Sequence, residues 1–179
     1  MTQTGKGNTM ATIGQMLTDT FGRVRESVRG TLQGIGEPLL TWRADPDANT
    51  IAWLVWHLTR VEDDHLAELA EVPPVWTSQR WSTRFALPFD DEASGYGFTS
   101  AQVAEVRADA DLLCGYHDAT HEMAVGWLDR LDESTLDRIV DERWEPPVTA
   151  AVRIVSVVED LMQHAGQAAF VRGLAERAR

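Results

Sequence analysis

The 179-residue chain is poor in cysteine, in basic residues and in long apolar runs. Cys114 is its one cysteine, which excludes an internal disulfide framework and any metal site built from several cysteines. Lys and Arg number 16 against 28 Asp and Glu, a formal net charge of -12, so a surface for nucleic acid or for an anionic membrane is not expected. No apolar run approaches the roughly 18–20 residues of a membrane span. These absences leave a soluble cytoplasmic protein as the expectation.

What the chain does have is enough apolar residues for a core, 44% of the AVILMFWYC set. They recur every three or four positions in four segments, each bounded by capping residues, glycines or prolines. Helices are therefore predicted over Thr12–Leu32, Thr50–Glu71, Thr99–Leu131 and Val148–Arg177. The last helix is expected to carry the two prolines at positions 146 and 147 at its first turn. Leu136–Val140 is a candidate for a short extra helix.

A segment of about 27 residues, Val72–Phe98, separates the second and third predicted helices and is rich in Pro, Trp, Ser and Asp. So long a connection fits a crossover that joins two parallel helices of a bundle. Strand-type alternation is nowhere sustained. The sequence therefore predicts an all-α fold, a single four-helix bundle domain over residues 1–179 with a long crossover between helices two and three. The first ten residues, MTQTGKGNTM, lack the apolar segment of a secretory signal and are expected to form a disordered tail.

Among the five histidines, His57 and His164 lie at the borders of apolar helix faces. Asp160 precedes His164 by four residues, so a carboxylate oxygen and an imidazole nitrogen on one helix face can converge on one ion. His57 would supply a third ligand, and two histidines with one carboxylate form a known open metal site. The spacing alone fits equally a packed helix-edge histidine and a surface Asp–His hydrogen bond, so both interpretations stay open at this stage.

Three other histidines and the cysteine have plainer interpretations. His117 and His121 form a second i,i+4 pair in the third helix, where a solvated or half-buried polar face is expected. His65 follows an acidic stretch and is expected on the helix surface. Cys114 is expected to be a buried small hydrophobe rather than a nucleophile, since only His117 and His121 follow it at helical spacing.

Several motifs together resemble a known superfamily. The stretch Asn49–Leu58, followed by Glu62, resembles the second helix of the DinB/YfiT-like superfamily, most of all the branch grouped with mycothiol-dependent maleylpyruvate isomerase. The run His164–Gln167, followed by Arg172, is similar to that superfamily's fourth-helix signature of His-X-Gly-Gln and a later Arg. Gly97–Val103 is similar to the opening of its third helix. The likeness extends from the first helix to Arg172.

The resemblance implies a divalent metal held by one residue of the second helix and two of the fourth, positions that fall on His57, Asp160 and His164. Asp160 stands where the superfamily usually has a histidine. It is a competent ligand for zinc and harder ions, and its negative charge would lower the Lewis acidity of the metal. Glu159 points about 100° away from this helix face. Zinc is expected first, and nickel, iron and manganese stay open.

The resemblance also implies a transferase or isomerase that uses a thiol cosubstrate such as mycothiol, a small-molecule electrophile and a homodimer. A bound dication lowers the pKa of a thiol, whose thiolate is the reactive form. Gln167 is a candidate to orient a ligand or water, and Trp53 to wall the crevice. Arg172 is a candidate to pair with a substrate carboxylate or with an acid of a neighbouring helix. No catalytic residue beyond the ligands is assigned. Two alternatives remain: a non-catalytic or stress-related metal-binding bundle, and a metal-dependent hydrolase.

Overall fold

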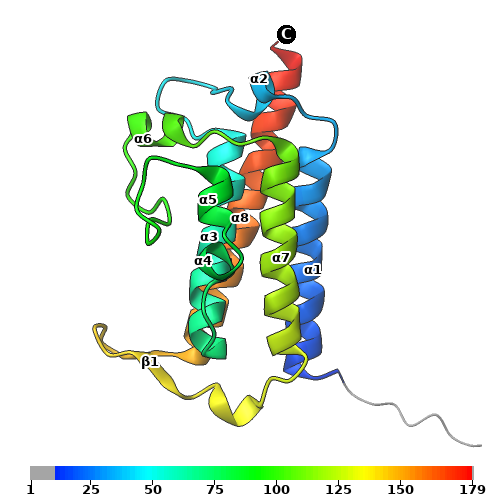
Figure 1. The fold of residues 1–179 in the computed structure, drawn as a ribbon. Helices are drawn as coiled ribbons and strands as arrows, with labels where there is room; N and C mark the ends of the chain where they lie inside the picture. The colour runs from blue at the N-terminus through cyan, green and yellow to red at the C-terminus, as the bar shows by residue number, and fades with distance from the viewer. Residues whose placement is uncertain (1–10, 179) are drawn as a thin grey trace, which may run out of the picture.

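Four long helices dominate the computed structural model, which describes residues 11–178 (Figure 1). The tail predicted at residues 1–10 lies outside the described residues. In chain order the elements are α1 (Ile13–Leu32), α2 (Glu37–Leu40), α3 (Ile51–Ala70), α4 (Val75–Ser78), α5 (Trp81–Phe85), α6 (Ser100–Glu105), α7 (Ala110–Leu128), the 3-10 turn η1 (Glu133–Thr135), β1 (Ile139–Asp141), β2 (Val148–Thr149) and α8 (Ala150–Arg177).

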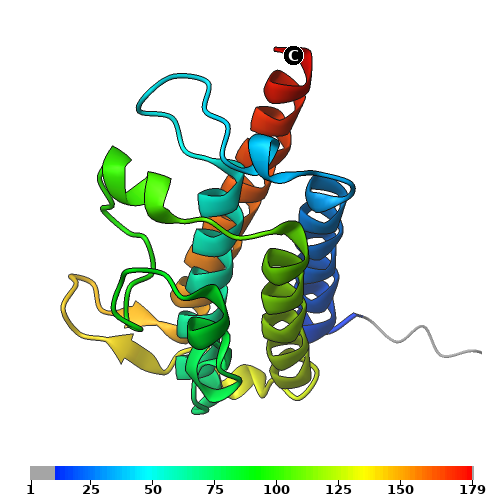
Figure 2. The same ribbon diagram turned by 45° about the horizontal axis from the view of Figure 1, so that its top comes forward.

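The long helices α1, α3, α7 and α8 form a bundle in which α1 and α3 each pack against both α7 and α8. In Figure 1 and Figure 2, α3 and α7 run in the same direction, opposite to α1 and α8. The segment between α3 and α7 therefore returns from one end of the bundle to the other, as a crossover between parallel helices must. The predicted all-α bundle with its long crossover is confirmed. Each helix within residues 11–178 is too short or too polar to span a bilayer.

Side-chain caps begin each of the four long helices. Thr12, Thr50, Asp109 and Thr149 each accept a hydrogen bond from the backbone N–H three residues later. Helix α3 is buried along most of its length, because α7, α8 and the crossover enclose it. The polar side chains that it carries therefore need partners from those neighbours.

The third predicted helix, Thr99–Leu131, is wrong as one continuous element. The chain forms the short α6, leaves helical geometry at Val106 and begins α7 only after Asp109. Asp109 caps α7 through a 2.7 Å hydrogen bond from the backbone N–H three residues later. Buried Val106 adopts an extended conformation, so the break turns its side chain into the core instead of continuing the helix.

The crossover is itself folded. Within Val72–Phe98 lie α4 and α5, which bring Trp76, Trp81 and Phe85 into the core. Trp76 packs edge-on against Trp56 of α3, with ring centroids 6.2 Å apart. The tryptophans of the crossover therefore fill core space against the bundle.

A small antiparallel sheet lies at the end of the bundle opposite the C-terminus (Figure 1). It pairs Ile139 with Thr149 and Asp141 with Val148. The short helix predicted at Leu136–Val140 is wrong, since η1 ends before it and β1 takes its last residues. The two prolines expected at the first turn of the last helix instead precede β2, because α8 begins only after its Thr149 cap.

Candidate functional site

His57 lies in the N-terminal half of α3 and is only 4% exposed. Its Nδ1 is 2.6 Å from the backbone carbonyl oxygen of Ser94, in the crossover. A carbonyl oxygen only accepts hydrogen bonds, so Nδ1 carries the proton and Nε2 keeps a free lone pair. Burial lowers the pKa of His57, so the ring is neutral near pH 7. The side chain therefore presents an unprotonated nitrogen toward α8.

Asp160 and His164 stand one turn apart on α8 and face His57. Asp160 Oδ2 lies 3.6 Å from His164 Nε2 and 3.9 Å from His57 Nε2. His164 Nδ1 donates to Gln167 Oε1 at 2.8 Å, which leaves its Nε2 free as well. One ligand atom from each of His57, Asp160 and His164 lies within 4.8 Å of the other two. The structure thus brings together the three residues that the sequence analysis selected.

This donor set fits a divalent cation. Asp160 Oδ1 is buried and has no hydrogen-bond partner among the described residues, which is costly unless an ion or a water completes it. Imidazole nitrogens and a carboxylate are ligands that zinc and other divalent transition metals accept. Three protein ligands also leave a coordination position for a small molecule. Glu159, next in the chain, turns away and accepts a hydrogen bond from Gln163.

Trp53 forms one wall of this group. Its ring stacks on His57, with centroids 4.6 Å apart and planes at 12°, and meets His164 edge-on at 5.8 Å. The two imidazole rings lie 4.9 Å apart. Contact with both rings restricts their rotation, so Trp53 holds the imidazoles as well as enclosing them.

The crossover approaches α3 so closely at Gly95 that no side chain fits there. Its φ is +96°, and an added Cβ would lie 2.9 Å from the Trp56 ring and 3.1 Å from His57 Nδ1. Gly95 thereby allows the carbonyl of Ser94 to reach the imidazole. Neither residue was predicted from the sequence, although the glycines at positions 95 and 97 are a signal for a close backbone approach.

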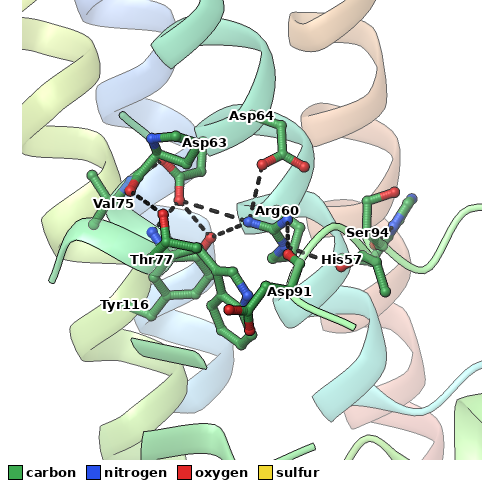
Figure 3. A network of polar contacts seen from close by, with 12 residues as sticks. His57, Arg60, Asp63, Asp64, Val75, Thr77, Asp91, Ser94 and Tyr116 are labelled. Carbon is green, nitrogen blue, oxygen red and sulfur yellow. Dashed lines mark hydrogen bonds and ion pairs between the residues drawn. The ribbon is translucent and has the colours of Figure 1, made fainter. Parts of the chain in front are cut away.

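Arg60 of α3 anchors the crossover segment that leads to Ser94 (Figure 3). Its guanidinium donates to the backbone carbonyls of Asp91 at 3.0 Å and Ala93 at 3.2 Å. The Asp64 carboxylate pairs with it at 3.0 Å. Burial raises the pKa of Asp64 to about 6, and the Arg60 charge opposes that rise. Arg60 therefore holds in place the backbone whose carbonyl meets the α3 imidazole.

Asp63 anchors the start of the same crossover. It accepts hydrogen bonds from the backbone N–H groups of Val75 at 2.7 Å and Trp76 at 2.6 Å, and from the Tyr116 hydroxyl at 2.8 Å. Both ends of the crossover are thus tied to neighbouring residues of α3. The burial of this acidic stretch was not predicted from the sequence, because charged residues normally lie on a helix surface.

His117 and His121 are buried, contrary to the expected solvated or half-buried face. His117 Nδ1 lies 3.6 Å from Glu62 Oε2 across the α3–α7 interface. Burial lowers the pKa of His117 to about 3 and raises that of Glu62 well above its usual value. Neither Glu62 oxygen has a hydrogen-bond partner in residues 11–178. We call Glu62, His117 and His121 the core cluster. His65, which was expected on the helix surface, is half-buried, and its Nδ1 lies 2.7 Å from Arg153 Nη1.

The Arg172 side chain, from α8, reaches the C-terminal end of α1. Its Nη1 donates to the backbone carbonyls of Gly30 at 3.0 Å, Thr31 at 2.8 Å and Gln33 at 2.9 Å, while Nε pairs with Glu176. A cation at the carbonyl end of a helix is stabilising. Of the two roles considered for Arg172, the structure shows the contact with a neighbouring helix, made to carbonyls rather than to an acid.

Cys114 is half-buried on α7, where full burial was expected. Its Sγ lies 3.8 Å from Asp118 Oδ2. Burial, assisted by the Asp118 charge, raises the pKa of the thiol. A raised pKa lowers the fraction of reactive thiolate at neutral pH, which disfavours Cys114 as a nucleophile.

A four-helix bundle with a crossover between parallel helices, and with two histidines and a carboxylate gathered between its second and fourth helices, fits the DinB/YfiT-like class. The sequence model described as mycothiol-S-transferase matches residues 16–176, so the chain belongs to the mycothiol-S-transferase family. This assignment confirms the resemblance seen in the sequence and relates the chain to mycothiol-dependent transferases.

A solved structure and the curated proteins complete the comparison. The crystal structure of a conserved protein of a locus from Enterococcus faecalis is similar to this chain, with 32% sequence identity and a TM-score of 0.86. The likeness covers 93% of this chain and 98% of that one. No curated protein matches the chain.

Proposed function

We propose that the protein is a metal-dependent transferase that uses a low-molecular-weight thiol of the mycothiol type as its nucleophile. The proposed metal ligands are His57, Asp160 and His164. The observation that carries the proposal is the convergence of their ligand atoms within 4.8 Å, beside an Asp160 oxygen that is buried and unpartnered within the described chain. Membership of the mycothiol-S-transferase family supports the thiol and the transfer reaction.

The charge of the ligand set suits thiol activation. Asp160 contributes one negative charge, and His57 is neutral because burial lowers its pKa. A bound dication would leave a net positive centre and would lower the pKa of a thiol beside it, which supplies the reactive thiolate. Zinc is the first candidate, since it commonly takes imidazole and carboxylate ligands, and nickel, iron and manganese take the same donors.

The chain's own residues orient the site. His57 and His164 place their Nδ1 protons on the Ser94 carbonyl and on Gln167, which directs both Nε2 atoms to one point. Trp53 holds the ring planes and shields one side from water. In the transfer, the thiol sulfur forms a bond to an electrophilic carbon, the leaving group departs with the bonding electron pair, and the thiol proton passes to solvent.

The test begins with protein purified without chelator, whose metal content is measured by mass spectrometry. We expect about one equivalent of transition metal per chain, removable by chelator. Conjugation of mycothiol to a reactive alkyl halide should then require the metal. Protein without appreciable metal would refute the site. Metal without conjugation across several thiols would support a non-catalytic metal-binding bundle, and metal-dependent cleavage by water would support a hydrolase.

We also propose that the protein is a homodimer formed through α1 and α8. These helices expose Ile13, Met16, Val152, Val155 and Met162, and the groove between them has a volume of about 480 Å³. Exposed apolar residues of this kind mark interfaces, and two-fold symmetric dimers are the commonest oligomers. Light scattering should give twice the 19.9 kDa chain mass, and Val155→Asp should give monomer. A monomeric wild-type protein would refute the dimer.

A further inference from the structure

A pocket of about 300 Å³ opens next to the proposed metal ligands, along the groove between α3 and α8. Its walls are Leu54, Gln167, Phe170, Val171 and residues 47–49, which lead into α3. Leu54 precedes His57 by three residues, and the α8 residues follow His164 by three to seven. At a helical rise of 1.5 Å per residue, the pocket walls lie about 5–10 Å along the groove from the ligands.

Gln167 joins the pocket to the ligands. Its Oε1 accepts the hydrogen bond from His164 Nδ1, and the same side chain lines the pocket. A molecule with its reactive group at His57 and His164 would therefore extend its remaining atoms into this pocket.

The pocket offers hydrogen-bonding groups without positive charge. Asp47, Asn49 and Gln167 supply a carboxylate and two amides, which together can accept from and donate to hydroxyl groups. Phe170, 65% exposed, offers an aromatic face to the C–H groups of a sugar ring. None of the described residues lining the pocket is basic, and Arg172, nearby on α8, is already bound to carbonyls of α1.

We infer that this pocket binds the polyhydroxyl body of the thiol cosubstrate, an inference that rests on the proposed transferase function. A thiol of the mycothiol type carries its cysteinyl group on an uncharged glucosamine–inositol unit that is rich in hydroxyls. The acceptors and donors of Asp47, Asn49 and Gln167 match those hydroxyls, and the distance along the groove leaves room for a cysteinyl arm. A thiol that carries carboxylates, such as glutathione, would meet the Asp47 charge and gain no ion pair.

The direct test uses a thiol-free probe, N-acetylglucosaminyl-inositol, titrated into chelator-treated protein by calorimetry. Saturable binding is expected, and Asp47→Ala and Phe170→Ala should each weaken it about tenfold. Asp90→Ala removes an exposed acid from the crossover, and Trp144→Ala removes an aromatic that is also 65% exposed, in the β1–β2 connection at the other end of the bundle. Both controls should bind the probe as the wild type does.

The outcomes separate the pocket from the metal chemistry. Probe binding that depends on Asp47 and Phe170, in a protein that neither holds metal nor transfers thiols, would uphold the pocket and refute the proposed function. Metal-dependent transfer without probe binding, or equal losses in the controls, would overturn the pocket. Glutathione should not displace the probe, and displacement at comparable concentration would overturn the selection against carboxylate-bearing thiols.

Discussion

On each of two sides of α3 a histidine lies close to a carboxylate, but the two pairs differ in burial and in hydrogen bonding. Toward α8, His57 meets Asp160 and His164, with its own proton held by a backbone carbonyl and the Asp160 side chain 29% exposed. Toward α7, Glu62 meets His117 at 3.6 Å in full burial, which favours the neutral form of both. Histidine and carboxylate spacing alone therefore does not define a metal site. At the proposed metal site, the distinguishing features are the partner of the second imidazole nitrogen and the access of the carboxylate.

The largest change in zinc affinity is expected from His57→Ala, which is compared with His121→Ala of the core cluster. Loss of one of three proposed ligands should lower the apparent zinc affinity by at least about 100-fold, whereas His121→Ala should leave it unchanged. Competition with a chromogenic chelator measures both affinities. Equal zinc binding by the two variants would remove the distinction between the two sides of α3.

Arg60→Met should cause the largest loss of stability. It leaves the Asp64 carboxylate without its partner and frees the crossover carbonyls, which should lower the free energy of unfolding by about 3–5 kcal/mol. Arg60 lies over the Trp76 ring at 5.0 Å, and Arg84 lies over the Trp81 ring at 4.3 Å but is exposed, so Arg84→Met is the matched control. Its loss should stay within about 1 kcal/mol. Similar urea denaturation midpoints for the two variants would show that Arg60 does not hold the crossover.

Glu62→Gln should reveal the protonated state of the core cluster. Burial raises the folded-state pKa of Glu62 above its ordinary value of 4.5, so its contribution to stability is complete below that pH and is lost as the pH rises toward the folded-state pKa. Glutamine cannot ionise. The stability of the variant relative to wild type should therefore grow by up to about 1.4 kcal/mol per pH unit above pH 4.5.

Two titratable groups near Glu62, His117 and Asp63, bear on this measurement. His117 stays neutral above its pKa of about 3, and Asp63, the other charge near Glu62, is present in both proteins. Glu26→Gln, which makes the same replacement at an exposed position of α1, provides the matched control. A pH-independent difference for Glu62→Gln would mean that Glu62 is ionised in the folded protein.

The smallest change in zinc affinity is expected from Gly95→Ala, which is compared with Gly97→Ala. Both positions have positive φ, but an added Cβ meets Trp56 and His57 only at position 95. Gly95→Ala should cost about 1–3 kcal/mol of stability and, by displacing the Ser94 carbonyl, about tenfold in zinc affinity. Gly97→Ala should cost about 1 kcal/mol and leave zinc affinity unchanged. Equal zinc affinities would show that the Ser94 contact does not orient His57.

Periodicity and caps placed α1, α3 and α8 within two residues of their observed bounds. The break before α7 was missed because residues 106–109 contain neither glycine nor proline, so nothing in the apolar pattern interrupts the helix. The available signal was Asp109, a favourable N-cap residue inside an apparently continuous helix. The strand at Ile139–Asp141 was too short to show an alternating pattern.

At the candidate site, the sequence predicted the residues whose side chains can themselves bind a metal, namely His57, Asp160 and His164. It did not reach Ser94, because that residue contributes a backbone carbonyl that every residue type possesses. It also missed the buried positions of Arg60 and Glu62, because burial of a charged group depends on partners distant in the chain.

The oxygen that receives the His57 proton belongs to the main chain and survives replacement of the Ser94 side chain. The next residue, Gly95, tolerates no substitution without a clash. Replacing the Ser94 side chain therefore leaves this carbonyl contact in place, whereas adding a side chain at Gly95 disturbs it. The tautomer of His57 is thus determined by the backbone conformation at Ser94 and Gly95 and not by the identity of a hydrogen-bonding side chain.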